Sequence, residues 1–321
     1  MDSRNSLNGK LVTLIGGSGY VGRHVAQQLL AAGARVRVAC RHPEKAMALK
    51  PLANLGQVQF VPCSVTHADS VAAAMQGADA AVYLVGAFDG NLDALHVRGP
   101  ALAARAAHDN GATAFVLMSA IGADAASDVP YARTKAQGEN AAREAFPGTT
   151  VLRASVLFGE DDKFINMFAG LAASLPILPV FGPKATMQPL WVDDAARAVL
   201  AALADPASHG GKTYEIAGPE ALTMAELNHR IADAAARKPL FVELPDSVSG
   251  IIATLTGWLP GAPITSDQWK LLQAGNVPSG KAPGLKELGV TPSPLGLFLD
   301  KWMVRYRKHG RFGTDVSAVR R

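Results

Sequence analysis

Residues 11–22 read LVTLIGGSGYVG, so that five mostly apolar residues run into Gly16, Gly19 and Gly22. An apolar pattern with helical spacing continues from Val21, and this order predicts a strand, a tight turn and a helix. The close approach of a pyrophosphate to such a turn leaves no room for a Cβ atom. The helix that begins there directs unpaired N–H groups and its positive dipole end toward a bound anion. The stretch therefore predicts a nucleotide site.

The glycine spacing is G-x-x-G-x-x-G rather than G-x-G-x-x-G, and an ordinary strand-to-helix turn is the alternative explanation. The position of the turn between a predicted strand and a predicted helix favours nucleotide binding. The expected cofactor contacts at this turn are Gly16, Gly17, Ser18, Gly19, Tyr20, Val21 and Gly22.

Strands alternate with helices along the first half of the chain. Further strands are predicted at residues 34–40, 58–62, 80–85 and 113–119, with an Ala-rich helix over residues 91–110. This alternation predicts an α/β fold with a doubly wound parallel sheet, the Rossmann arrangement. We expect residues 1–155 to form the NADP-binding domain and residues 156–321 to form a smaller α/β domain on the substrate or partner side, interleaved with the sheet around residues 190–218.

The residue just after the second strand bears on the choice of nicotinamide nucleotide. An acid at this position accepts hydrogen bonds from the adenosine 2′-hydroxyl and repels a 2′-phosphate. This sequence has Arg41 there. A guanidinium pairs with phosphate and stacks on adenine, so NADP(H) is favoured over NAD(H), a solvated arginine being the alternative.

Other strand ends supply further candidate contacts to the cofactor. Gly86, at the end of the fourth strand, lets the chain turn beside the nucleotide. The full set of expected contacts outside the glycine turn is Arg41, Ser64, Val65, Val85, Gly86, Ser119, Tyr131, Lys135, Ala154 and Val156.

Tyr131 and Lys135 form a Y-x-x-x-K pair on a predicted helix. Four residues apart, the phenol and the ammonium share one helix face, and the positive charge is expected to lower the pKa of the phenol. Such a pair can act as general acid and base while Lys135 holds the nicotinamide ribose. The catalytic candidates are Tyr131, Lys135 and Ser119, and no cluster of ligands indicates a metal site.

The glycine triplet, Ser119, the Y-x-x-x-K pair and LWVDDAA at residues 190–196 together resemble the extended and atypical short-chain dehydrogenase/reductase superfamily, which includes NAD-dependent epimerases and dehydratases. The resemblance implies a serine that polarises a carbonyl, a tyrosine that transfers the proton and an assisting lysine. Alignment of the fifth strand can place Ala120 rather than Ser119 at the serine position. That departure counts against catalysis and leaves cofactor binding untouched.

Three stretches, LFGEDDKFINMFA (157–169), ENAAREAFP (139–147) and PGLKELG (283–289), resemble the nucleotide-binding accessory subunit of respiratory complex I. This resemblance implies tightly held NADPH, a place beside the quinone-entry region of the membrane arm, and no established turnover. We therefore expect a weakly or non-catalytic accessory subunit. The alternatives are a free-standing reductase, epimerase or dehydratase that uses Tyr131 and Lys135, and an NADP(H)-sensing regulator.

Charge and cysteine content limit the remaining possibilities. The 321 residues carry a net charge of +4, but residues 301–321 hold seven Lys and Arg against one acid, so the basic character belongs to the C-terminus and nucleic-acid binding is not expected. Cys40 and Cys63 are the only cysteines, which indicates reduced thiols in the cytoplasm, with a peripheral position on the inner face of the respiratory membrane as a further expectation.

Three C-terminal segments allow more than one explanation. The stretch LPILPVFGP (175–183) is expected to be an irregular cap over the nicotinamide, since it is rich in proline. The nearly uncharged residues 248–259 are too short to cross a bilayer and either pack in the core, the more common outcome, or lie on a lipid or partner surface. A basic amphipathic helix from Leu295 to Tyr306 fits either an anionic membrane or a capping role within the second domain.

Overall fold

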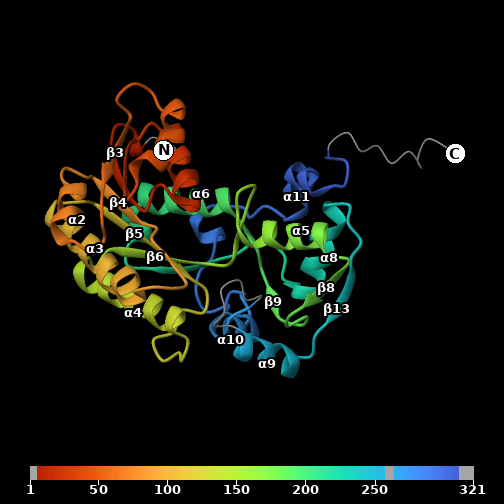
Figure 1. Ribbon diagram of the computed structural model, residues 1–321. Helices are drawn as coiled ribbons and strands as arrows, with labels where there is room; N and C mark the ends of the chain where they lie inside the picture. Colours follow the sequence, from red (N-terminus) through yellow and green to blue (C-terminus); the bar gives the residue numbers. More distant parts are fainter. Residues whose placement is uncertain (1–5, 257–263, 311–321) are drawn as a thin grey trace. The chain divides into compact units, whose positions relative to one another are not determined.

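The computed structural model describes residues 6–256 and 264–310 (Figure 1). The chain divides into two compact units. The first unit consists of Met1–Ser155, Val192–Ala217 and Pro278–Pro292, and the second of Val156–Trp191, Gly218–Val277 and Ser293–Arg321. The segment Pro278–Pro292 thus belongs with the sheet, a return of the chain that no sequence pattern predicts.

The first unit is built on a seven-stranded sheet in the order β11-β6-β5-β4-β1-β2-β3. Its strands are β1 (Leu11–Ile15), β2 (Arg35–Cys40), β3 (Val58–Pro62), β4 (Ala80–Tyr83), β5 (Ala114–Ala120), β6 (Thr149–Ala154) and β11 (Thr213–Ile216). All neighbouring strands are parallel, which confirms the doubly wound α/β prediction. The strand order changes direction beside β1, between β1 and β4, and sheets of this type bind ligands at the carboxyl ends of such strands.

Helices cover this sheet on its two faces (Figure 1). The described helices of this unit are α1 (Tyr20–Ala31), η2 (Pro43–Leu52), α2 (Ala68–Met75), η3 (Ala94–Arg98), α3 (Gly99–Asp109), α4 (Pro130–Ala145), α6 (Val192–Ala204), α7 (Pro206–His209) and η4 (Lys286–Leu288). The single helix predicted over residues 91–110 is wrong in detail, because Ala94–Arg98 forms a π-helical turn. The buried Tyr83 hydroxyl donates to the carbonyl oxygen of Leu95 at 2.6 Å, and in an α-helix that carbonyl would accept the N–H of Gly99.

Within its described residues, the second unit has three two-stranded ladders. These pair β7 (Leu157–Phe158) with β10 (Leu190–Trp191), β9 (Thr186–Met187) with β12 (Leu222–Thr223), and β8 (Ile177–Val180) with β13 (Leu240–Glu243). Its helices are α5 (Phe164–Ser174), α8 (Met224–Ala234), α9 (Asp246–Thr256), α10 (Ser266–Ala274), α11 (Gly296–Met303) and the short η5 (Val304–Tyr306). A core of buried aliphatic and aromatic side chains joins α5, α8 and α11.

The structure corrects the expectation for residues 175–183 and decides between the two explanations for the last helix. The irregular cap expected at residues 175–183 is wrong, because Ile177–Val180 forms β8, and Pro179 is tolerated in a strand that has one neighbour. On α11, Trp302 and Met303 are buried, and Phe298 stacks on Trp191 with ring centroids 3.9 Å apart. The apolar side of this helix is therefore used inside the second unit, as the capping explanation requires.

Candidate functional site

The glycine turn joins β1 directly to α1. Gly16 has a φ of +83°, and a Cβ atom on it would lie 2.9 Å from the Val85 side chain. A Cβ atom on Gly22 would lie 2.6 Å from both Cα and the carbonyl oxygen of Gly17, so the first turn of α1 packs against the backbone of the loop. Gly19 caps α1 without a side-chain hydrogen bond, and the first turn holds no acid. No acid of this first turn neutralises the positive end of α1, which suits an anionic ligand, and Asp193 of α6 lies 2.7 Å from His24 in the second turn.

The parallel register brings most of the expected cofactor contacts to one edge of the sheet. Arg41 follows β2, Ser64 and Val65 follow β3, Val85 and Gly86 follow β4, and Ser119 and Ala154 lie in the last two residues of β5 and β6. The Arg41 side chain is exposed and has no ion-pair partner within residues 6–256 and 264–310. Val156, two residues after the end of β6, is assigned to the second unit.

Tyr131 and Lys135 lie on α4, within one turn of each other. The Lys135 ammonium donates to the carbonyl oxygen of Met118 at 3.4 Å and lies 5.9 Å from the centroid of the Tyr131 ring. A Cβ atom on Gly86 would lie 3.4 Å from the same ammonium. The carboxyl ends of β4 and β5 therefore meet the Y-x-x-x-K pair.

Two aromatic neighbours of Tyr131, Phe88 and His96, belong to no motif that the sequence analysis could identify. The exposed Phe88 ring, from the loop after β4, stacks on Tyr131 with centroids 4.4 Å apart, and the buried His96 ring meets it edge-on at 5.5 Å. His96 Nε2 accepts the backbone N–H of Ala87, and Nδ1 lies 3.0 Å from the Thr134 hydroxyl, which itself donates to the carbonyl oxygen of Pro130. These partners fit a neutral ring with its proton on Nδ1. Burial and the charge of Lys135 lower the pKa of His96 to about 3, which agrees with a neutral ring.

The expected activation of Tyr131 is not found. Burial raises the pKa of its phenol to about 12, and the ammonium of Lys135 makes no hydrogen bond to it that would offset the loss of hydration. Burial also lowers the pKa of Lys135 to about 8, although the carboxylate of Glu139 acts in the opposite direction. The prediction of a lowered tyrosine pKa is therefore wrong, since desolvation outweighs the nearby charge.

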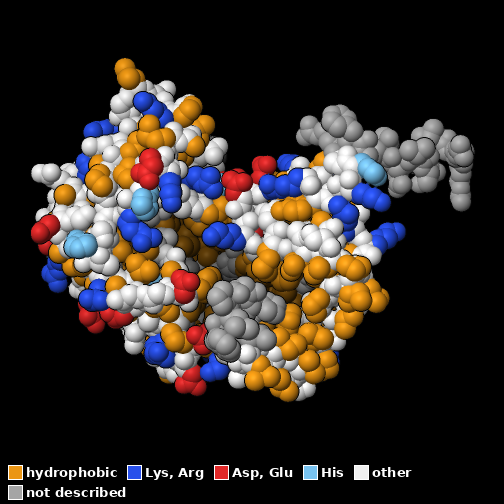
Figure 2. Space-filling model, in the orientation of Figure 1, with side chains coloured by type: hydrophobic (Ala, Val, Ile, Leu, Met, Phe, Trp, Pro, Cys, Tyr) orange, Lys and Arg blue, Asp and Glu red, His pale blue; other side chains and the backbone are white. Residues whose placement is uncertain are grey.

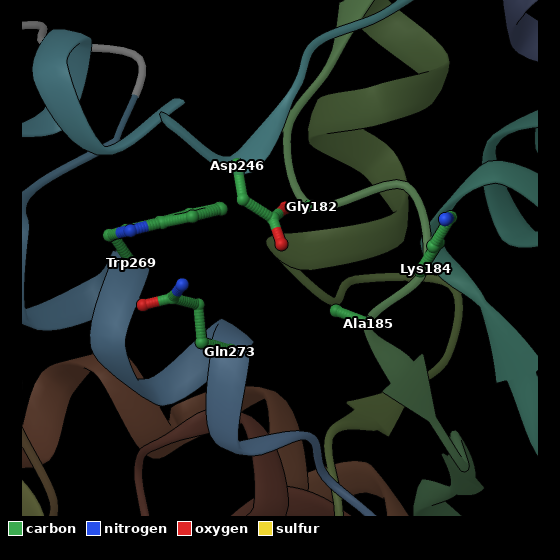
Figure 3. A pocket seen from close by; sticks show the side chains of 6 residues that line it. All are labelled: Gly182, Lys184, Ala185, Asp246, Trp269 and Gln273. Carbon is green, nitrogen blue, oxygen red and sulfur yellow. The ribbon is translucent and has the colours of Figure 1, made fainter. Parts of the chain in front are cut away.

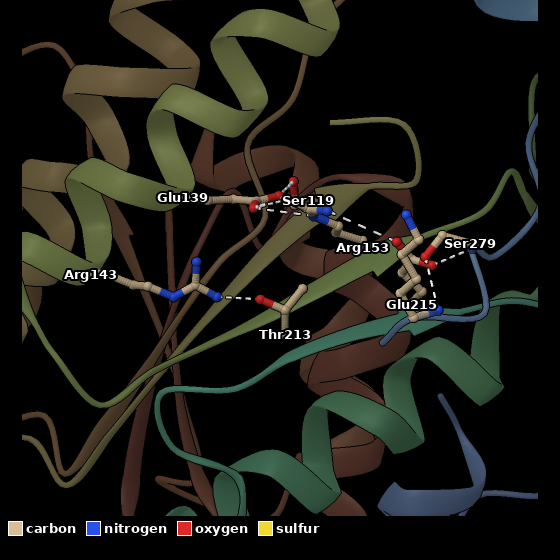
Figure 4. A network of polar contacts seen from close by, with 8 residues as sticks. Ser119, Glu139, Arg143, Arg153, Thr213, Glu215 and Ser279 are labelled. Carbon is tan, nitrogen blue, oxygen red and sulfur yellow. Dashed lines mark hydrogen bonds and ion pairs between the residues drawn. The ribbon is translucent and has the colours of Figure 1, made fainter. Parts of the chain in front are cut away.

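Ser119 belongs to a buried polar network (Figure 4). Its hydroxyl donates to Oε1 of Glu139 at 2.5 Å, and Nη2 of Arg153 donates to Oε2 of the same carboxylate at 2.7 Å. Arg153 also lies 3.9 Å from Glu215, whose carboxylate accepts the backbone N–H of Ser279 at 2.5 Å. The hydroxyl of Ser119 thus uses its one proton in the hydrogen bond to Glu139. Glu139 was not among the predicted site residues, although its place four residues after Lys135 puts it on the same helix face.

A separate small cavity lies wholly within the second unit (Figure 3). Its volume is about 200 Å³, and its lining consists of Gly182, Lys184, Ala185, Asp246, Trp269 and Gln273. Within the part of the chain that the structure describes, no three His, Cys, Asp or Glu side chains are grouped as metal ligands.

Comparison with known proteins adds family relationships to this geometry. Residues 16–163 match a family described as NAD(P)H-binding, and residues 127–252 match the RmlD substrate binding domain. NADH dehydrogenase (ubiquinone) 1 alpha subcomplex subunit 9 of Arabidopsis thaliana is 31% identical over 98% of this chain and 82% of its own length. A ceramide reductase of Caulobacter vibrioides is 28% identical over 88% of this chain and 86% of its own length.

Solved structures share the fold. The dTDP-glucose 4,6-dehydratase DesIV of Streptomyces venezuelae, solved with NAD and TYD bound, superposes with a TM-score of 0.69 at 19% identity, covering 94% of this chain and 98% of the dehydratase. At this identity the likeness is one of fold, and it agrees with the parallel seven-stranded sheet.

Proposed function

Because this chain belongs to the family of subunit 9 of the NADH dehydrogenase (ubiquinone) 1 alpha subcomplex, we propose that it is a nucleotide-holding accessory subunit of respiratory complex I. In this role the chain binds NAD(P)H in the first unit and turns it over weakly or not at all. Its partners are subunits of the membrane arm near the quinone site, and its place is the periphery of the inner face of the respiratory membrane.

One contrast within the first unit supports this proposal most strongly. The parts expected to hold a dinucleotide are present, since the glycine turn, the start of α1 without a side-chain cap and Lys135 lie at the carboxyl edge of the sheet. The parts that would perform proton transfer are not poised, because the hydroxyl of Ser119 is bound by Glu139 and the Tyr131 phenol has a raised pKa. A nucleotide site whose proton-transfer groups are not poised for reaction fits a subunit that uses the nucleotide as a structural group.

We further propose that the nucleotide is NADP(H) rather than NAD(H). Arg41 is exposed at the end of β2, next to the strand that leads into the glycine turn. A guanidinium at this position can form charge-assisted hydrogen bonds to a 2′-phosphate, and its flat face can stack on adenine. Ser64, Val65, Val85 and Ala154 supply the remaining contacts of this edge.

A free-standing NAD(P)-dependent reductase is the second candidate. The relationship to the ceramide reductase of Caulobacter vibrioides, together with the complete Y-x-x-x-K pair on α4, favours it. In this case Tyr131 donates the proton to a carbonyl oxygen, Lys135 assists, and Ser119 must leave Glu139 to polarise the carbonyl. NADPH supplies the hydride.

Replacement of Tyr131 by phenylalanine distinguishes the two candidates. We expect NADPH oxidation, measured at 340 nm with a panel of carbonyl compounds that includes long-chain ketones, to stay at background in both the native protein and Tyr131→Phe. Tyr306→Phe, which removes a hydroxyl bound to Asn166 in the second unit, is the matched control. Turnover that Tyr131→Phe abolishes and Tyr306→Phe preserves would establish the reductase and overturn the accessory role.

A further inference from the structure

The second unit exposes large aliphatic side chains on two adjoining elements. On the β8–β13 ladder the exposed residues are Ile177, Leu240 and Val242, and on α9 they are Val248, Ile251 and Leu255. Each of the six is between 39 and 66% exposed, and we call them the apolar face. Residues 248–255 follow the expected burial only in part, since Ser249 and Ala253 are buried while Val248, Ile251 and Leu255 are exposed, and the side chains of residues 256–259 lie outside the described part.

The register explains why these side chains point outward together. Ile177 pairs with Leu240 and Pro179 with Val242, so these residues share one side of the ladder. The alternate residues Leu178 and Phe241 pack inward against α5 and α8. Leu244, between β13 and α9, donates its N–H to Val180, and α9 turns Ala253 toward Trp269. Both elements thus use one side for the core and keep a second apolar side.

Hydrophobic side chains gather over β13 and α9 in the space-filling view, with Lys and Arg side chains beside them on the same unit (Figure 2). We call Arg237, Lys238, Arg307 and Lys308 the basic rim. Lys238 stands two residues before Leu240. Arg237 donates to the carbonyl oxygen of Tyr306 at 2.7 Å, and Arg307 donates to that of Ala234, so the two basic segments lie together. Asp233 lies four residues before Arg237 and Asp300 pairs with Arg307, while Glu243 ends β13 and Asp246 begins α9, so acids also lie on the elements of the apolar face. No ion pair within the described residues engages Lys238 or Lys308, so their charges are available to an anionic surface.

The composition of the apolar face distinguishes between possible occupants. Leu and Val are under-represented among the residues that dominate binding at protein interfaces. Four of the six residues of the apolar face are Leu or Val, and aliphatic side chains beside Lys and Arg are the combination that enters the boundary between head groups and acyl chains.

We propose that the apolar face, with the basic rim at its edge, binds the surface of a lipid bilayer that contains anionic lipid. The aliphatic side chains enter the acyl boundary and the basic rim contacts the head-group phosphates. None of the helices within residues 6–256 and 264–310 has the length and hydropathy to cross a bilayer, so this contact lies in the plane of the surface. We therefore assign the membrane contact to the apolar face and not to α11, because the apolar side of α11 is buried. The proposal does not depend on assembly into complex I.

Vesicle flotation with the full-length protein tests the proposal. The vesicles are phosphatidylcholine alone or phosphatidylcholine with about one-third phosphatidylglycerol, the anionic lipid that attracts a basic surface. We expect the native protein to float with the anionic vesicles. The variant Leu240→Thr/Val242→Thr/Ile251→Ser is expected to lose at least about tenfold in partitioning, since each substitution removes methyl or methylene groups that would enter the bilayer. Lys238→Glu/Lys308→Glu is expected to reduce binding to the anionic vesicles only.

The matched control is Leu297→Ser, because Leu297 and Ile251 are both 59% exposed and Leu297 lies outside the apolar face. NADPH binding and the melting temperature verify that each variant is folded. Equal flotation of the native and triple-substituted proteins, or no flotation with either vesicle, would overturn the proposal. A native dimer that becomes a monomer in the triple variant would assign the face to a second copy of this chain instead.

Discussion

Replacement of Glu139 by glutamine is expected to lower the free energy of unfolding by about 3 kcal/mol, at the lower end of the cost of breaking a buried ion pair. Glu139 is 1% exposed and holds both Ser119 and Arg153. Its loss leaves a largely buried guanidinium with one distant carboxylate, Glu215, at 3.9 Å. Urea unfolding measures the change, and Glu144→Gln, an exposed substitution on the same helix, is the control.

The same variant tests the link between this network and Lys135. The carboxylate of Glu139 raises the pKa of Lys135, so its removal is expected to lower that pKa further below about 8. A buried lysine with a lowered pKa destabilises the folded state most at a pH where the lysine is charged. The folded protein releases this proton at a lower pH than the unfolded chain does, so stability rises with pH through the interval between the folded and unfolded pKa values. In Glu139→Gln this rise should begin at lower pH. Identical unfolding curves for Glu139→Gln and Glu144→Gln would contradict the structural role of Glu139.

Nucleotide binding should respond differently to substitutions at Gly22 and at Arg41. Gly22→Ala forces a Cβ atom to within 2.6 Å of the Gly17 backbone, and the loop must shift because backbone atoms cannot rotate away. We expect the affinities for NADPH and NADH both to fall by about 100-fold, a loss of roughly 3 kcal/mol. Arg41→Ala should weaken NADPH binding alone, by about tenfold or more, because it removes the guanidinium that we propose forms charge-assisted hydrogen bonds to the 2′-phosphate.

Isothermal titration calorimetry with each nucleotide measures these affinities. Gly296→Ala is the control, since a Cβ atom on Gly296 meets nothing within 4 Å. Equal affinities of the native protein for NADPH and NADH would remove the role of Arg41. Native affinity in a folded Gly22→Ala protein would show that the glycine turn does not form the nucleotide site.

The sheet was predictable because its signals are local. Alternating apolar strands and helices, and a glycine turn after β1, depend on neighbouring residues in the chain. The π-helical turn at Ala94–Arg98 escaped prediction, and the hydrogen bond that the Tyr83 hydroxyl donates to the Leu95 carbonyl there joins residues of two different elements.

The site was only partly predictable for a related reason. Sequence spacing identifies Tyr131 and Lys135 as a pair, but it gives no measure of burial, which sets the direction of both pKa shifts. The partner of Ser119 comes from a different element twenty residues away. On α9, the uncharged composition does not reveal which side faces solvent, since both sides are apolar.

The most direct test of the accessory role is the mobility of this chain in respiratory membranes from its own cells, solubilised in mild detergent and separated by native electrophoresis. We predict that the chain migrates with complex I and that NADP(H), released by denaturing the excised complex, is present with it. Migration of the chain as a free protein, with complex I intact elsewhere in the same gel, would contradict the account.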